Sequence, residues 1–225
     1  MKVSIIIPCL YDRGWLSEAI RSALNQDFDN YEIILASDGN ASLKGVADEY
    51  GIRFVLSDRV NLSHTQNVAI RAAEGEYIKG LADDDHLPFD CLKNLYNNIG
   101  EYSLIYADAV NFKGKNKLIS TSRARPVTIE DMMVRNCIHG GTTMYRRDIF
   151  LEVGGRDETI DNSEDYDFYL NLLSRGHKFT FINEVVYYYR KHKKQKSKWP
   201  DDPHRRRTQN YIRKKYEKFI IRPGT

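Results

Sequence analysis

The chain has 225 residues, 41% of them hydrophobic, which is enough to build a sizeable core and excludes a disordered protein. No apolar run approaches the roughly 20 residues that cross a bilayer, and the apolar N-terminal run is too short for the core of a signal peptide. Three widely spaced cysteines, Cys9, Cys91 and Cys137, form no CxxC pair and indicate neither a zinc site nor a disulfide framework. These features predict a protein of the reducing cytoplasm.

The net charge of +3 is unevenly distributed along the chain. Residues 190–222 hold 14 Lys and Arg against three acids, so the rest of the chain holds 20 basic and 28 acidic residues, a net charge of −8. A basic tail suggests an anionic partner, and peripheral contact with an anionic membrane at its inner face is one candidate. Nucleic acid is a less favoured candidate, and a basic helix face that is only solvated is the commoner outcome.

The first half of the chain alternates predicted strands with predicted helices. Continuous runs of β-branched residues are typical of buried parallel strands, and apolar residues at three- and four-residue spacing predict helices. The predicted strands are 3–7, 31–36, 52–56 and 77–81, and the clearest helices lie around 15–24 and 68–73. This order predicts an α/β fold with a mostly parallel sheet.

The second half is more mixed. It is predicted to contain short strands at 104–107, 109–112, 142–145, 179–182 and 185–189, and helices at 147–153 and 164–175. Gly114-Lys115-Asn116 suits a hairpin turn.

The acidic triplet Asp83-Asp84-Asp85 follows an apolar strand and precedes Pro88, which can start a helix. Adjacent carboxylates repel one another, and a divalent cation shared with a diphosphate would relieve that repulsion. A solvated turn that caps the next helix is the alternative. Asp38 also follows a strand, and ligands of such sheets bind beyond the carboxyl ends of the strands, so Asp38 and the triplet can share one crevice.

An ordered set of motifs resembles the inverting glycosyltransferase family 2, whose members have a GT-A fold. No GxGxxG, P-loop or GxSxG motif is present to indicate another enzyme class. The resembling segments are the strand 3–8, the helix 19–26, the strand and turn 31–39, Asn67 with 72–78, Gly154-Gly155, the acidic segment 163–167 and Tyr189-Arg190-Lys191-His192.

The resemblance implies a GT-A domain over 1–197 and leaves a basic helical tail over 198–225. The domain would contain a Rossmann-like, mostly parallel sheet flanked by helices, with a small second sheet near the acidic triplet, which would be the DXD motif. The implied reaction moves a sugar from a nucleotide-diphosphate donor, preferably a UDP-sugar, to a hydroxyl of a glycan or lipid-linked acceptor.

The resemblance also implies roles in donor binding. Asp38 resembles the residue that accepts a hydrogen bond from the uracil base, although without the resemblance an Asp-Gly turn would be the preferred interpretation. Asp83 resembles the ribose contact, and Asp84 resembles the ligand of Mn²⁺ or Mg²⁺. His192 resembles a histidine that completes the metal site, or it belongs to the basic run. Pro8 and Asn67 complete the expected donor-binding set.

Asp165 resembles the catalytic base, although acids in a helix's first turn also complement its dipole. Asp85, Gly141, Arg156 and Glu164 are expected around the acceptor or behind the site residues. Residues 112–135 are candidates for acceptor loops.

Ser37 and Ala82 stand where the family often has Asp, which leaves the base preference open and keeps a non-catalytic nucleotide-sugar-binding module as an alternative. A pyrophosphorylase and a nucleic-acid binder are the lower-ranked alternatives.

Overall fold

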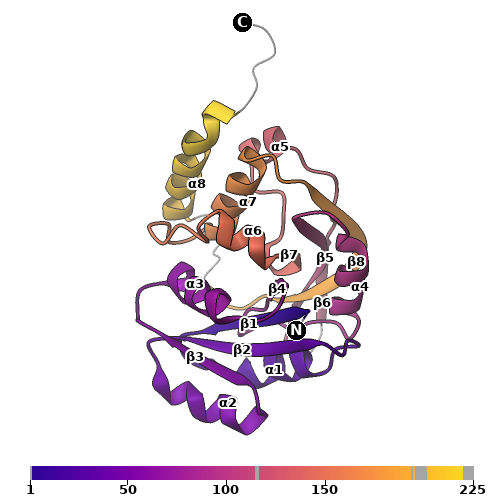
Figure 1. Cartoon of the computed structure of the whole chain (residues 1–225), viewed down its shortest axis with the longest axis vertical. Helices are drawn as coiled ribbons and strands as arrows, with labels where there is room; N and C mark the ends of the chain where they lie inside the picture. The colour runs from indigo at the N-terminus through magenta and orange to yellow at the C-terminus, as the bar shows by residue number, and fades with distance from the viewer. Residues whose placement is uncertain (1, 115–116, 194, 196–201, 220–225) are drawn as a thin grey trace, which may run out of the picture.

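Eight strands among the described residues, which are 2–114, 117–193, 195 and 202–219 of this computed structural model, form one sheet (Figure 1). The strand order is β3-β2-β1-β4-β7-β5-β6, and β8 pairs with β5 off this path. The strands are β1 (Val3–Cys9), β2 (Tyr31–Asp38), β3 (Arg53–Ser57), β4 (Tyr77–Gly80), β5 (Leu104–Lys113), β6 (Lys117–Ser122), β7 (Met144–Arg146) and β8 (Phe179–Arg190). The helices are α1 (Leu16–Leu24), α2 (Lys44–Tyr50), α3 (Leu62–Ala72), α4 (Cys91–Ile99), α5 (Ile129–Val134), α6 (Arg147–Glu152), α7 (Glu164–Ser174) and α8 (Pro203–Tyr216).

The parallel half of the sheet is buried on both faces. β1 pairs in parallel with β2 on one side and with β4 on the other. Because successive strand side chains point to opposite faces, Ile5 and Ile7 join one core cluster and Ile6 joins the other. Residues of α1, α2 and α4 cover the first face, and residues of α3, α6 and α7 cover the second. This layering confirms the predicted α/β fold.

The second half differs from the predicted short strands. β5 and β8 are each one continuous strand, paired in parallel with register shifts around Asp108. Asp108 is fully buried in β5, where its carboxylate accepts hydrogen bonds from the Ala124 amide and the Arg123 guanidinium, both at 2.6 Å. A buried carboxylate with such partners does not interrupt a strand.

The small second sheet expected near the acidic triplet is not separate, because β5, β6, β7 and β8 belong to the same sheet as β1. β6 pairs antiparallel with β5, as a hairpin predicts, although Lys115 and Asn116 of the predicted turn lie outside the described residues.

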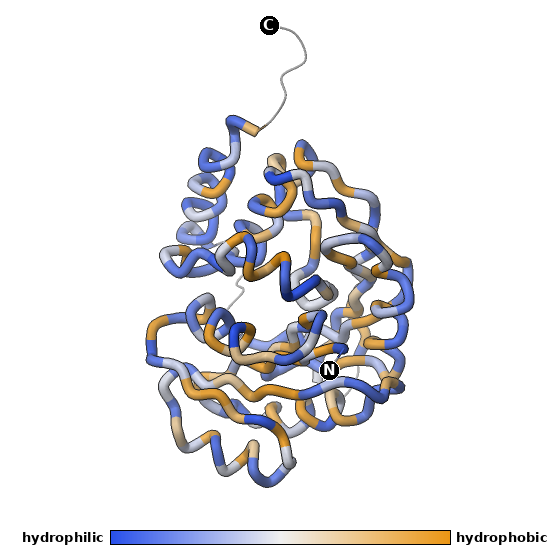
Figure 2. Tube along the Cα trace, viewed as in Figure 1, coloured by the Kyte–Doolittle hydropathy of each residue, from blue (hydrophilic) through white to orange (hydrophobic). Residues whose placement is uncertain are grey.

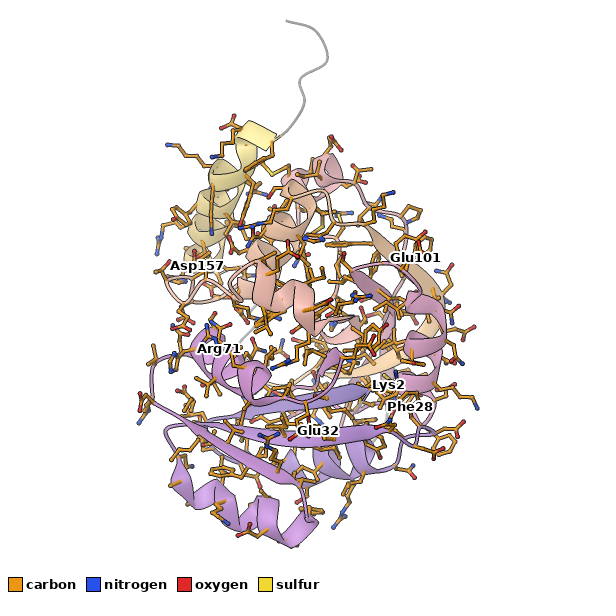
Figure 3. The ribbon with its side chains drawn as sticks, viewed as in Figure 1. Lys2, Phe28, Glu32, Arg71, Glu101 and Asp157 are labelled. Atoms are coloured by element: carbon orange, nitrogen blue, oxygen red, sulfur yellow. The ribbon has the colours of Figure 1, made fainter. Side chains whose placement is uncertain are left out.

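The basic C-terminal segment contains the expected helix, and that helix is docked. Ile212 and Tyr216 of α8 are buried in the core cluster that holds α7. Lys215 forms ion pairs of 2.9 Å with Asp157 and with Asp167 of α7, and Figure 3 labels Asp157 beside α8. The rest of α8 is mostly hydrophilic (Figure 2). The predicted boundary between 197 and 198 lies outside the described residues. Within those residues, no helix has the length and apolar character to cross a membrane.

Candidate functional site

Two adjoining cavities of opposite charge lie beyond the carboxyl ends of the parallel strands. The first, of about 610 Å³, is called here the acidic cavity, and the second, of about 730 Å³, the basic cavity. The acidic cavity is lined by Asp38, Asp83, Asp84, Asp85, Asp161, Glu164 and Asp165, with Arg13 and Arg205 as its cations. The basic cavity is lined by Arg123, Arg125, Arg135, Arg156, Lys191 and Arg205, with Asp85, Glu164 and Asp165 as its acids. Pro8 and Asp165 line both cavities, which therefore meet at Asp165.

The guanidinium of Arg13 relieves the repulsion within the acidic triplet. Its Nη2 lies 2.5 Å from Asp83 Oδ1 and 3.1 Å from Asp84 Oδ2. Burial raises the pKa of Asp83, and the charge of Arg13 opposes that rise. Arg13 lies in the loop between β1 and α1, and nothing in its local sequence indicates this role. The loop brings it to the triplet only once β1 and β4 are paired.

Asp84 and His192 form the pair that the sequence predicts to bind metal. His192 Nε2 lies 2.8 Å from Asp84 Oδ2, and the imidazole packs on Trp15 with ring centroids 4.3 Å apart. Two ligands of one Mg²⁺ at about 2.1 Å stand about 3 Å from each other, so this spacing suits a shared ion. The described residues contain no group of three or more His, Cys, Asp and Glu suited to a metal. An ion here would take its other ligands from water and from a bound phosphate.

Asp85 supports the triplet from behind. It is 1% exposed, and its carboxylate accepts hydrogen bonds from Tyr187 Oη at 2.8 Å and from the Arg190 amide at 2.7 Å. Burial and the charge of Asp84 raise the pKa of Asp85 well above its usual range. The residue that precedes α4 is Asp90, so the alternative in which Asp85 caps this helix is wrong. Asp85 instead ties the triplet to β8.

Asp38 and Ser37 lie at the end of β2. Asp38 lines the acidic cavity, where its Oδ1 accepts a hydrogen bond of 3.1 Å from the Val60 amide. Ser37 is fully buried, and its hydroxyl donates to the Asn40 carbonyl and accepts from the Asn40 amide. Gly39 has φ of +75°, which favours glycine. The turn therefore shapes the cavity wall while one oxygen of Asp38 has no hydrogen-bond donor among the described residues.

Asn67, which the resemblance predicts to bind the donor, is not among the residues that line either cavity. The residue is 1% exposed, and its amide is used to hold the loop after α6. Its Nδ2 donates to the Arg156 carbonyl, and its Oδ1 accepts from the Arg156 amide, both at 2.9 Å. Asn67 thus positions Arg156, which lines the basic cavity.

Asp165 stands in the first turn of α7, at the junction of the cavities. Burial and the neighbouring Glu164 raise its pKa, and Arg156 opposes the rise. The two residues before Glu164 adopt left-handed backbone conformations, with φ of +78° at Asn162 and +70° at Ser163. Non-glycine residues rarely adopt these conformations, and such strain is concentrated at functional sites.

Helix α8 and a glycine turn hold this segment in place. Gln209 of α8 donates to Ser163 Oγ at 3.5 Å, and Asn162 donates to Asp202, just before α8, at 3.5 Å. A Cβ at Gly140 would lie 2.7 Å from Asp165 Oδ2, so a larger residue there would displace the Asp165 carboxylate. Gln209 and Asp202 both belong to residues 198–225, which the sequence assigned to a separate basic tail.

A buried lysine fixes the same glycine turn. Lys79 of β4 is fully buried, and its Nζ donates to the carbonyls of Gly80 and Gly141. Burial lowers the pKa of Lys79 to about 8. A Cβ at Gly141 would overlap the ring of Tyr187, so this glycine is needed for packing although it also lines the basic cavity. The strand pattern placed Lys79 in β4 without indicating that its ammonium reaches across to this turn.

Comparisons with known proteins agree with this geometry. The family model described as glycosyl transferase family 2 matches residues 4–154, a match that ends before Asp165 and His192. An uncharacterized glycosyltransferase of Rickettsia conorii is 30% identical over 87% of this chain and 35% of its own length. The chondroitin synthase of Escherichia coli is 27% identical over 82% of this chain and 28% of its own length. This chain thus spans about a third of these relatives.

The fold has a solved counterpart. The crystal structure of Staphylococcus aureus TarS 1-349 in complex with UDP-GlcNAc superposes with a TM-score of 0.74, at 18% identity, over 94% of this chain and 65% of that one. The predicted GT-A fold is therefore confirmed. At this identity the likeness concerns the fold, and the ligand of TarS stays a property of TarS.

Proposed function

Because the chain belongs to glycosyl transferase family 2, we propose that it transfers a sugar from a nucleotide-diphosphate donor to a saccharide hydroxyl with inversion, aided by a divalent metal. The observation that carries the proposal is that Asp84 and Asp165 line one cavity at the strand ends, while His192 Nε2 lies 2.8 Å from the Asp84 carboxylate. The opening of that cavity beyond β1 and β2 is where ligands of parallel sheets bind.

The donor would lie in the acidic cavity. Asp38 is acceptor-only when ionised, which suits the imide N–H of uracil and supports a UDP-sugar as the preferred donor. Asp83 would contact the ribose. Mn²⁺ or Mg²⁺, held by Asp84 and His192, would neutralise the charge that develops on the departing diphosphate. Pro8, which lines the cavity, would pack against the nucleotide.

Arg13 would change partners when the donor binds. Its guanidinium pairs with Asp83 and Asp84, so an ion on Asp84 would displace it from that carboxylate. A guanidinium suits phosphate oxygens, which it can contact with two parallel hydrogen bonds. Arg13 would then contribute a second positive charge to the leaving group.

Asp165 would act as the base. Its carboxylate would take the proton of the acceptor hydroxyl while that oxygen attacks the anomeric carbon from the face opposite the diphosphate. The bond from the anomeric carbon to the diphosphate oxygen breaks as the new glycosidic bond forms, so one displacement inverts the centre. A pKa raised by burial and by Glu164 makes Asp165 a stronger base than an ordinary aspartate.

The test is nucleotide release from UDP-, GDP-, dTDP- and CMP-sugars, with and without Mn²⁺ and with a panel of oligosaccharide acceptors. We expect Mn²⁺-dependent release from one donor and a loss of at least about 100-fold in Asp84→Asn. Asp90→Asn is the matched control, since Asp90 lines neither cavity and should leave release unchanged. Nucleotide binding without release, with every acceptor supplied, would favour the non-catalytic module instead.

Contact of α8 with an anionic membrane is a second, independent part of the proposal. Arg206, Arg207 and Lys214 are exposed on α8, and Tyr211 beside them is 57% exposed. Basic residues with an exposed aromatic side chain suit an anionic lipid surface. Cosedimentation with phosphatidylserine vesicles should fall in Arg206→Gln/Arg207→Gln, and equal binding to neutral vesicles would contradict this part.

A further inference from the structure

The basic cavity is lined by six cationic side chains and three acidic ones, and some of the cations form no ion pair among the described residues. Arg123 is paired with the buried Asp108, and Arg125 lies 3.9 Å from Asp131. For Arg135 and Lys191, no ion pair or side-chain hydrogen bond occurs among the described residues. The Lys191 ammonium lies 4.3 Å from the ring centre of Tyr189, and the Arg135 side chain is exposed at the end of α5. Two cations on the cavity wall therefore form no ion pair within the described part of the chain.

Buried polar atoms in the same wall also lack partners. Arg156 is 9% exposed, and its Nε and Nη1 are buried without a hydrogen-bond acceptor in the described part of the chain. His139 and Gln66 line the same cavity, and their Nδ1 and Oε1 atoms are likewise buried without a hydrogen-bond partner among the described residues. Burying a polar atom without a hydrogen-bond partner is unfavourable, so the collection of such atoms at one cavity indicates a ligand.

The remaining walls suit a sugar chain. Tyr189, which is partly exposed, lines the basic cavity, and a tyrosine ring offers an apolar face to a sugar ring. Ser120, Ser122 and Asn111 add neutral hydrogen-bonding groups from β5 and β6. Ser120 and Ser122 fall within 112–135, the segment expected to form acceptor loops.

We propose that the basic cavity is the acceptor subsite and that it takes a saccharide carrying phosphate or carboxylate groups. The assignment rests on the proposed function, because the acceptor hydroxyl must reach Asp165 at the junction of the cavities. The anionic groups of the acceptor then lie toward Arg135 and Lys191. The polar groups of Arg156 and His139 meet the saccharide deeper in the cavity.

The probes are three oligomers of similar length: a phosphodiester-linked polyol, an oligogalacturonate and neutral maltohexaose. Binding to the full chain is measured by titration calorimetry at two salt concentrations. We expect at least one anionic oligomer to bind, with an affinity that falls as salt rises, and maltohexaose to bind at least tenfold more weakly. Comparing the affinities for the phosphodiester and the galacturonate oligomers then identifies which anionic group the cavity selects.

Charge-matched double variants locate the site. Arg135→Gln/Lys191→Gln should weaken binding of the preferred anionic oligomer about tenfold. Lys44→Gln/Lys93→Gln removes the same charge from exposed positions on α2 and α4 and should leave the affinity unchanged. Thermal unfolding of each variant, measured in parallel, verifies that the fold is retained.

Equal affinity for maltohexaose, absence of binding by both anionic oligomers, or equal losses in the two double variants would each overturn the proposal. The proposed function fails separately, since it requires nucleotide release rather than oligomer binding. Release that proceeds on neutral acceptors alone, with no anionic oligomer bound, would leave the transferase intact and remove the anionic subsite.

Discussion

The acidic and basic cavities differ in how they are built as well as in charge. The acidic cavity is framed by the ends of β1 and β2 and by the segment after β4, strands whose register is fixed by parallel pairing through a buried core. The basic cavity is formed largely by β5, β6, the α5 end and loops. Rigid strand ends suit a ligand portion that is shared by many donors, whereas loops allow the acceptor to vary.

Asp165 belongs to both cavities, so its replacement should have the largest effect. Asp165→Asn keeps the shape of the side chain and removes its basicity, and we expect transfer to fall about 10³-fold while donor affinity is retained. Steady-state nucleotide release and donor titration measure the two quantities. Asp167→Asn is the control on the same helix, where the carboxylate pairs with Lys215 instead. Transfer by Asp165→Asn at near wild-type rates would remove Asp165 from its role.

Replacement of His192 should affect metal binding at the acidic cavity alone. His192→Ala removes one of two proposed metal ligands, and we expect about 100-fold more Mn²⁺ for half-maximal transfer. Binding of an anionic oligomer in the basic cavity should be unaffected. His204→Ala removes an exposed histidine from α8 and serves as the control. An unchanged Mn²⁺ requirement in His192→Ala would restrict the metal site to Asp84.

Lys215 tests whether α8 is part of the enzyme body. Lys215→Met removes the cation beside the buried Asp167, and we expect the free energy of unfolding to fall by about 1–2 kcal/mol because Lys215 is partly exposed. Lys214→Met, at the neighbouring exposed position, should change stability by less than about 0.5 kcal/mol. Urea unfolding provides both values, and equal stability of the two variants would mean that α8 is only loosely attached.

Replacement of Glu164 should have the smallest effect on transfer and is the most specific test of Asp165. Its charge contributes to the raised pKa of Asp165, so Glu164→Gln should lower that pKa. Transfer requires ionised Asp165 and falls as the pH drops through this pKa, so the acid limb of the kcat profile should move to lower pH. Glu101→Gln, on the loop after α4, is the control (Figure 3). A shift to higher pH would show that Glu164 is not the group that raises the pKa of Asp165.

The sequence predicts the acidic cavity better than the basic one. Asp38, Asp83 and Asp84 each follow an apolar strand, so local pattern and chain order suffice to bring them together. Arg13 has no such pattern, because it reaches the triplet only through the folded loop.

Long-range partners explain the other differences. Asp108 suggested a break between two short strands because its partner Arg123 lies 15 residues away. Asn67 matched a donor-binding motif, yet its amide bonds with Arg156 across 89 residues. The cations of the basic cavity come from several segments, and only the fold gathers them around one space.

The most direct test is a crystal structure of Asp165→Asn with UDP and Mn²⁺. We predict an anomalous difference peak for Mn²⁺ beside Asp84, His192 and the diphosphate. The uracil should lie beside Asp38, and the basic cavity should stay open to an acceptor. A UDP molecule among Arg123, Arg135 and Lys191, or a metal bound away from Asp84, would contradict the assignment of donor and acceptor to the two cavities.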